Sequence, residues 1–156
     1  MNIMKKQTLF TLKGIFIPTI LFRLNPSFKW EKDKVEINTS VEVDYSHKGK
    51  EFTVQVRVEM PDGENAPFSF AVEGVGSFAL QEEPPENVLE SIARINCAAI
   101  IFPYIREAIA DLTRRAGVPP LHLQPVNFVA LKEEKSAEKN PEIIAPKRVA
   151  TKKKVT

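Results

Sequence analysis

Apolar and polar residues alternate along two neighbouring segments in the first half of the chain. In residues 35–45 the odd positions carry Val, Ile, Thr or Tyr, and the even positions carry polar or acidic residues. In residues 52–60 the even positions are all apolar. Such alternation is typical of a β-strand with one buried face. Because the intervening residues 47–50 contain Gly49, the two strands are predicted to form a hairpin.

Two further segments have weaker strand patterns. Residues 68–80 alternate at first, and then Gly74 and Gly76 predict a bend or bulge. Residues 8–24 are another strand candidate, in which a glycine and Pro18 predict a sheet edge or a bend. The expected result is a four-stranded antiparallel sheet with one apolar face, which another element must cover.

The covering element follows in the second half of the chain. Apolar residues recur at steps of four and three from Val88 to Ala116, which indicates a helix. Pro103 lacks an amide hydrogen, so a kink or break is predicted there, and Gly117 with the prolines behind it ends the helix. Residues 128–138 are predicted to form a second, shorter helix. The predicted fold class is therefore α+β: a four-stranded antiparallel sheet packed with a long helix and a short C-terminal helix.

The long helix carries a second apolar flank. Its members widen the apolar stripe beyond what contact with one sheet requires, and they are Ala98, Ile101, Ile105, Ala108 and Leu112. One interpretation is self-association, in which another subunit covers this flank. The alternative is a broad contact inside one chain, and the pattern leaves both open.

The formal net charge of +2 hides an asymmetry along the chain. Residues 132–156 hold 8 basic and 4 acidic residues out of 22 and 20, which leaves 14 basic and 16 acidic residues in residues 1–131. We therefore predict one globular domain in residues 1–135 and a disordered basic tail in residues 136–156. Because the positive charge lies outside the packed domain, no nucleic-acid partner is predicted. An adaptor that binds nucleic acid or a membrane surface through the tail is the alternative from a different class.

Side chains suited to catalysis are scarce. The single cysteine, Cys97, cannot form an internal disulfide or a zinc site with paired cysteines, and it is predicted to be a buried, inert thiol in a reducing cytoplasm. The two histidines lack metal-ligand spacing, and no phosphate-binding loop is present. The sequence therefore predicts no enzyme, no metal and no cofactor.

The apolar residues 15–22 follow several lysines, which raises the question of a signal peptide. Pro18 splits this run and no small-residue cleavage site follows it, so a signal peptide is not expected. No stretch approaches the ~20 apolar residues that a membrane-spanning helix needs, and stable membrane insertion is not predicted.

Two large aromatic residues, Phe28 and Trp30, lie in a polar connection between strands, residues 25–34. Aromatic side chains in such a loop either fasten it to the core or line a binding groove. The pattern leaves both possibilities open.

Two motifs in the second half of the chain resemble those of a known family. They are F-P-Y-x-R-E at residues 102–107 and, after the helix stop, L-x-L-x-P-V-N-F-x-A-L at residues 121–131. Together they strongly resemble the SecB family of protein-export chaperones, and the likeness extends more loosely over residues 7–135. The resemblance implies a four-stranded sheet beside a long and a short helix, in agreement with the pattern.

The resemblance also implies a function and an assembly. SecB-like proteins hold unfolded preproteins or other nascent polypeptides in apolar grooves without ATP, and they deliver preproteins to the SecA motor. They form homotetramers, dimers of dimers with the long helices between the dimers, which would place the second apolar flank at that interface. By analogy, the candidates for the groove lining are Phe28, Trp30, Val126, Phe128 and Leu131.

The chain departs from the family on the sheet surface that SecB-like proteins present to SecA. At the positions aligned with acidic residues it carries Thr19, Arg23 and Ala71. Only Glu73, on the same strand face as Ala71, could partly substitute for them. An alternative is therefore a SecB-like chaperone dedicated to another client, such as an antitoxin.

Overall fold

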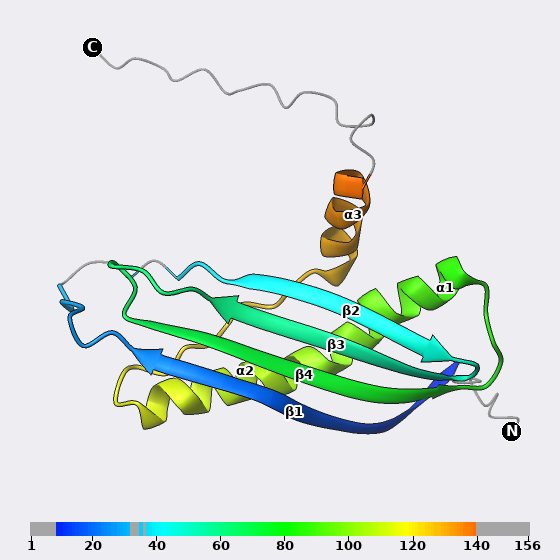
Figure 1. Ribbon diagram of the computed structural model, residues 1–156, viewed down its shortest axis with the longest axis horizontal. Helices are drawn as coiled ribbons and strands as arrows, with labels where there is room; N and C mark the ends of the chain where they lie inside the picture. The colour runs from blue at the N-terminus through cyan, green and yellow to red at the C-terminus, as the bar shows by residue number, and fades with distance from the viewer. Residues whose placement is uncertain (1–8, 32–34, 36, 140–156) are drawn as a thin grey trace, which may run out of the picture.

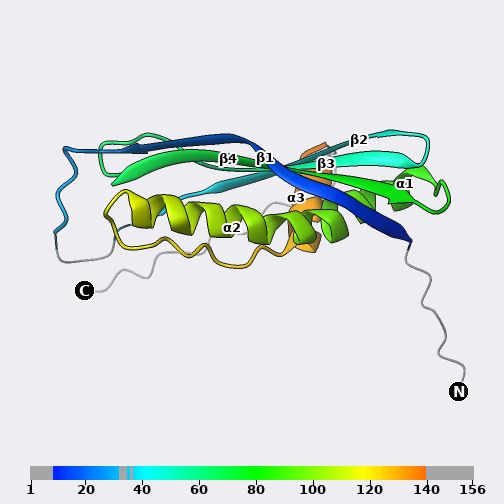
Figure 2. The ribbon, with the colours of Figure 1, turned by 90° about the horizontal axis from the view of Figure 1, so that it is seen from below.

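A sheet of four antiparallel strands lies against a helical layer in the computed structural model, which describes residues 9–31, 35 and 37–139 (Figures 1 and 2). The order across the sheet is β1-β4-β3-β2, so β1 and β2 form its edges. This arrangement confirms the predicted fold class. The strands are β1 (Phe10–Leu24), β2 (Ser40–Lys48), β3 (Glu51–Met60) and β4 (Phe68–Leu80).

The hairpin of β2 and β3 is confirmed, but β2 begins at Ser40 rather than at residue 35. Its first pair joins Ser40 to Glu59, next to the end of β3 at Met60. In this register β3 ends opposite position 39, so the described residues before it have no residue of β3 opposite them with which to exchange hydrogen bonds. Alternation in the sequence indicates side-chain orientation, and it carries no information on where the neighbouring strand ends.

The bend or bulge predicted at Gly74 and Gly76 is absent from the pairing of β4 with β3, which keeps one register along its length. The register shifts lie in the pairing of β4 with β1, around Gly14 and Pro18, where the sequence predicts irregularity. An edge strand tolerates such shifts because only one of its sides belongs to the ladder.

The two glycines of β4 lie against side chains of the long helix. A Cβ atom at Gly74 would lie 2.8 Å from Cγ2 of Ile101 and 3.2 Å from Cδ1 of Ile105. A Cβ atom at Gly76 would lie 3.0 Å from Cδ1 of Ile101. Both isoleucines are fully buried. Glycine therefore permits a close approach between helix and strand, and the centre of the core lies at this contact.

One continuous helical segment covers the sheet: α1 (Glu86–Ser91), the π-helix η1 (Ile92–Cys97) and α2 (Ala98–Arg115). The sequence predicts a kink or a break at Pro103, and the break is wrong because Pro103 lies inside α2. The departure from α-helical hydrogen bonding occurs upstream instead, in the wider turns of η1. The end of α2 agrees with the prediction, since Gly117 follows with a φ of +84°.

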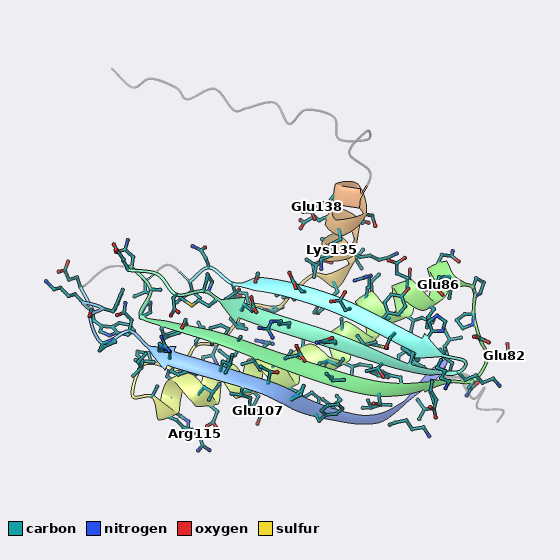
Figure 3. All side chains as sticks on the ribbon, in the orientation of Figure 1. Glu82, Glu86, Glu107, Arg115, Lys135 and Glu138 are labelled. Atoms are coloured by element: carbon teal, nitrogen blue, oxygen red, sulfur yellow. The ribbon has the colours of Figure 1, made fainter. Side chains whose placement is uncertain are left out.

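The short helix α3 (Phe128–Lys139) confirms the second predicted helix. Figure 1 shows α3 standing off the β2 side of the sheet, and Figure 3 shows Lys135 and Glu138 on its part farthest from the strands. Its last turn includes residues 136–139, which the charge pattern assigns to the tail. The rest of the predicted tail, residues 140–156, lies outside the described residues.

The helical segment Glu86–Arg115 is long and apolar enough to cross a membrane. The search of the sequence for a run of about 20 apolar residues did not find it. However, 44% of an apolar 18-residue stretch of this segment is buried inside the protein. A core helix meets the same criteria of length and composition, and the buried isoleucines of α2 account for the apolar character.

Cys97 is buried, and burial raises the pKa of its thiol from 9.0 to about 12. The thiol of the unfolded chain ionises at lower pH, so Cys97 should leave the free energy of unfolding unchanged below pH 9.0 and lower it as the pH rises toward 12. Urea unfolding of the wild type and of Cys97→Ala at about pH 8 and about pH 10 measures this effect. The wild type should lose more stability than the variant, and equal losses would contradict the expectation.

Candidate functional site

The connection after β1 begins with a turn that is tied to the loop between β3 and β4. The backbone N–H of Asn25 donates to the carbonyl of Pro67 at 2.9 Å, and its side-chain amide donates to the carbonyl of Ala66 at 2.9 Å. The side-chain oxygen of Asn25 accepts the N–H of Ser27 at 3.1 Å. These bonds fix the start of the segment that carries the two predicted aromatic residues.

Phe28 and Trp30 pack on each other at this end of the sheet. Their ring centroids lie 5.1 Å apart with an interplanar angle of 81°, which is the favourable edge-to-face geometry. Trp30 keeps 53% of its surface exposed, and Phe28 is half-buried. Neither belongs to the core cluster of the described residues. The geometry therefore favours an exposed apolar surface over a loop fastened to the core.

A cavity of about 510 Å³ opens along the same loop. Its walls come from the loop after β1 and from the turn between β3 and β4, and Leu24, Ala66 and Phe68 supply the apolar part of the lining. Arg23 and Asp62 supply charged groups. A cavity of this size lies within the usual range of ligand pockets, and it has room for apolar side chains of a bound peptide.

The second predicted set, Val126, Phe128 and Leu131, is largely internal. Phe128 is only 5% exposed and packs edge to face on Phe102, with ring centroids 5.7 Å apart. Val126 and Leu131 are partly buried against the core. The structure therefore places Phe128 in the core, where it anchors α3 to α2, rather than in an open groove.

The structure does not bring the two predicted sets together. Figure 1 shows the loop after β1 at one end of the sheet, whereas α3 stands beside β2. Any polypeptide that contacts both sets would have to extend along the molecule.

Two side chains of α2 hold the extended segment that leads to α3. Oγ1 of Thr113 accepts the N–H of Leu121 at 2.9 Å. Nε of Arg106 donates to the carbonyl of Leu123 at 2.9 Å. Arg106 belongs to the first family-like motif and Leu123 to the second, so the bond between them connects the two motifs in space. Residue spacing alone does not predict these contacts.

The predicted self-association flank is mostly used inside the chain. Ala98, Ile101 and Ile105 are 0% exposed, and both isoleucines point at β4. The placement of these three residues at a subunit interface is therefore corrected, because their side chains belong to the internal core. Ala108 and Leu112 are partly buried and remain candidates for such a contact.

A different part of α2 faces outward. Tyr104 is 48% exposed. Together with Ile17, Ala108 and His122 it lines an open cavity of about 470 Å³ between α2, β1 and the segment after α2. The outward surface of the helix is therefore centred on Tyr104, which the apolar pattern did not single out.

Exposed apolar side chains concentrate on β1. On the side of the sheet that faces the helices, Leu12 is 41%, Ile20 50% and Leu24 39% exposed. Because β1 is an edge strand, the outer side of its backbone has no strand to pair with among the described residues. The edge position agrees with the prediction from Gly14 and Pro18. This edge is suited to pair with another strand.

The four residues predicted to face SecA share one surface. Thr19 pairs with Glu73 across β1 and β4, and Arg23 and Ala71 occupy the same side of these strands. This side is opposite to that of Gly74, which contacts α2. The four therefore lie on the outer face of the sheet.

Glu73 is not a free acidic group on that face. Nη1 of Arg57 lies 3.4 Å from Oε2 of Glu73, and Arg57 also pairs with Glu59. The hydrogen bond with Glu59 raises the pKa of Arg57 above its ordinary value, with Glu73 adding to the effect. Arg57 is thus held charged between the two carboxylates, and it partly offsets the charge of Glu73, the acidic residue that could substitute for the missing ones.

Ion pairs account for several charged side chains in the part of the chain that the structure describes. No group of three or more His, Cys, Asp or Glu side chains there could hold a metal ion. On α2, hydrogen bonds from Arg115, at 2.6 Å, and from Arg114 hold the pKa of the Asp111 carboxyl below its usual value. Such ion pairs are ordinary on an exposed helix surface.

Comparisons with known proteins agree with the motifs. The family model described as preprotein translocase subunit SecB matches residues 4–139. A protein-export protein SecB of Acidithiobacillus ferrooxidans is 40% identical over 101 residues, which cover 64% of this chain and 67% of the relative. The protein-export protein SecB of an Azoarcus species is 32% identical over 139 residues, which cover 85% of this chain and 91% of the relative.

A solved structure shares the fold. It is a SecB-like chaperone of Mycobacterium tuberculosis in complex with a ChAD peptide from an antitoxin, and it superposes with a TM-score of 0.65 at 18% identity. The match covers 75% of this chain and 90% of the other.

Proposed function

The chain belongs to the SecB family of chaperones for preprotein export, and from this premise we propose how it holds its clients. An unfolded polypeptide lies on the exposed pair Phe28 and Trp30 and inserts apolar side chains into the cavity lined by the same loop. The observation that carries this proposal is Trp30, a large aromatic residue with 53% of its surface exposed. Val126 and Leu131 add partly exposed apolar surface for a client long enough to reach α3.

Holding of this kind needs neither ATP nor a cofactor. Burial of apolar surface contributes about 25 cal/mol per Å², and an unfolded client exposes such surface whereas a folded one does not. Binding to the unfolded client lowers the concentration that is free to aggregate. The selectivity then depends on how long a client stays unfolded rather than on a particular sequence.

We propose a homotetramer built as a dimer of dimers, and two surfaces support it. The edge of β1, with Leu12, Ile20 and Leu24, can pair with the same edge of a second chain and extend the sheet. The outward surface of α2 around Tyr104, with Ala108, can lie between two such dimers. Both surfaces carry exposed apolar groups that association would bury.

Delivery to SecA and a cytoplasmic location are proposed from the family. Glu73 is the only acidic residue among Thr19, Arg23, Ala71 and Glu73, and Arg57 partly offsets its charge. This surface therefore has little acidic charge to attract a basic partner. This loss favours a second candidate function, a SecB-like chaperone dedicated to another client such as an antitoxin. The shared fold with the chaperone solved in complex with an antitoxin peptide is compatible with that candidate.

Trp30→Ala should weaken the binding of unfolded polypeptide by at least about tenfold, because a buried aromatic anchor at an interface is worth 2 kcal/mol or more. The measurement is fluorescence anisotropy with a labelled, reduced and alkylated protein that cannot fold. Trp30→Phe keeps an aromatic ring and should retain most of the affinity. Val88→Ala, at a residue that is 40% exposed on α1, is the control; equal affinities of Trp30→Ala and this control would exclude Trp30 from the client surface.

Deletion of residues 140–156 separates the chaperone from the adaptor of a different class. The truncated chain should still suppress aggregation of an unfolded substrate, because the proposed client surface lies outside the deleted residues. An adaptor would instead lose binding to nucleic acid or to anionic vesicles, since three of the tail's basic residues are Lys152, Lys153 and Lys154.

A further inference from the structure

A pocket of about 350 Å³ lies where β1 begins and where the connection from β4 to α1 leaves the sheet. Figure 1 shows these elements at the same end of the molecule. The volume falls within the usual range of ligand pockets, about 300–1,000 Å³. We call it the end pocket, and its apolar lining consists of Leu9, Leu80, Pro84, Pro85, Val88 and Ile92.

Two carboxylates border the end pocket, and its lining contains no basic residue. They belong to Glu82 and Glu83, which are both exposed, and Figure 3 shows Glu82 at this end of the molecule. Neither forms an ion pair with another residue that the structure describes. The pocket is therefore suited to a segment that combines aliphatic side chains with basic ones.

Other charged groups near this end are engaged with one another or lie outside the lining. Glu86 lies 3.2 Å from His47, and Glu90 pairs with Arg94 at 3.1 Å. Further charged residues near this end, none of which lines the pocket, are Lys13 of β1, Lys48, Lys50 and Glu51 of the hairpin, and Lys132 of α3. The carboxylates of the lining are thus without a basic neighbour inside the pocket.

The chain directly before Leu9 has the matching chemistry. Two apolar and two basic residues follow one another there, outside the described residues, and they are Ile3, Met4, Lys5 and Lys6. The tail has similar side chains at residues 152–155, but it follows α3, whereas residues 3–6 lie only a few positions before a lining residue. A shorter tether gives a higher effective concentration at the pocket, which favours the segment before Leu9.

The pairing of β1 with β4 directs this segment along the pocket. The N–H of Gln81 donates to the carbonyl of Leu9 at 3.3 Å, next to the antiparallel pair of Phe10 with Leu80. A chain that continues in this register before Leu9 runs beside residues 82–85, which form one wall of the end pocket.

We propose that residues 3–6 cover the end pocket. The two aliphatic side chains lie on the apolar lining around Val88, and the two lysines lie beside the carboxylates of Glu82 and Glu83. The covered lining is then withheld from other polypeptides. This contact is independent of the proposed client surface, because that surface lies at the other end of β1.

The reactivity of a thiol at position 88 tests the proposal in the full chain. Val88 is 40% exposed, so Val88→Cys introduces a thiol in the pocket wall without removing a core side chain. The native Cys97 is buried, and burial raises its pKa to about 12, so it contributes little to alkylation by iodoacetamide. The measurement is the rate of alkylation of the introduced thiol.

Ile3→Ser with Met4→Ser should raise this rate at least about fivefold, because the cover loses its apolar contacts. Lys5→Gln with Lys6→Gln should raise it about twofold to fivefold, as expected for exposed ion pairs. Loss of two positive charges would by itself disfavour the thiolate and slow the reaction, so an increase reports uncovering. Val129→Cys, at a residue that is 48% exposed on α3, is the control whose rate should not change.

Several results would overturn the proposal. One is an equal rate with and without the two serine substitutions. Another is a rate that rises only when Lys152, Lys153 and Lys154 are replaced by glutamine, since the tail would then be the cover. A rate that depends on protein concentration would assign the cover to another copy of the chain. If Val88→Cys does not fold, hydrogen exchange of residues 81–92 in chains that keep Val88 must increase with the serine substitutions, and unchanged exchange counts against the proposal.

Discussion

Ile101→Ala is expected to lower the free energy of unfolding by about 2–5 kcal/mol, the range for loss of a buried isoleucine. Ile101 is 0% exposed and lies against Gly74 and Gly76. Removal of its side chain leaves a cavity between α2 and β4 that the two backbones cannot close, because the sheet and the rest of the helix hold them apart. The shift of the urea midpoint at constant slope measures the loss, at one protein concentration for all variants.

Tyr104→Asp is the matched control on the same helix. Tyr104 is 48% exposed, so this substitution should change the free energy of unfolding of one chain by no more than about 0.5 kcal/mol. If the outward surface of α2 lies between dimers, the substitution should instead shift the peak of the assembly toward smaller particles on a sizing column. If Ile101→Ala dissociated the assembly and Tyr104→Asp did not, Ile101 would instead lie at the subunit interface.

The different roles of Ile101 and Tyr104 show what a helical pattern can and cannot predict. Steps of three and four correctly indicate that α2 covers the sheet. The width of the buried stripe depends on the opposite strand, where Gly74 and Gly76 have no side chains and allow the helix to approach closely. A helix that lies so near the sheet buries most of both apolar flanks and leaves Ala108 and Leu112 partly exposed. A stripe of this width is therefore compatible with a contact that lies largely inside one chain.

Local patterns predict the elements of this fold well and their limits less well. The hairpin of β2 and β3, the end of α2 before Gly117 and the helix α3 all follow from short stretches of sequence. The start of β2 depends on where β3 ends, and the π-helical turns of η1 lie upstream of Pro103 rather than at it. These two features are set by neighbouring segments, so a local pattern cannot predict them.

The sequence likewise predicts only part of the candidate site. Phe28 and Trp30 stand out in the sequence because they are large aromatic residues in a polar loop, and the structure leaves Trp30 exposed. Phe128 is also a large aromatic residue, and the family resemblance suggests it as part of the groove. It lies in the core instead, because α3 packs on Phe102 through it. The pairing of Glu73 with Arg57 requires the register of β3 against β4, which the sequence does not contain.

Gly74→Ala is expected to lower the free energy of unfolding by about 1–3 kcal/mol, the usual cost of extra volume in a packed core. The new Cβ would lie 2.8 Å from Cγ2 of Ile101 and 3.2 Å from two atoms of Ile105. These side chains are fully buried, so they have no free space into which to move. The same substitution restricts the unfolded chain and gains about 0.4–1 kcal/mol, which is smaller than the cost. Urea unfolding measures the net effect.

Gly14→Ala is the matched control, because it makes the same chemical change on the neighbouring strand without any atom within 4 Å of the new Cβ. Only the effect on the unfolded chain remains there, so this variant should be unchanged or more stable by up to about 1 kcal/mol. In a chain that already carries Ile101→Ala, the cost of Gly74→Ala should shrink, since the nearest of the three atoms that the Cβ would meet is gone and only those of Ile105 remain. Equal effects at Gly74 and Gly14, or a cost at Gly74 that does not depend on Ile101, would contradict a core built on the close approach of α2 to β4.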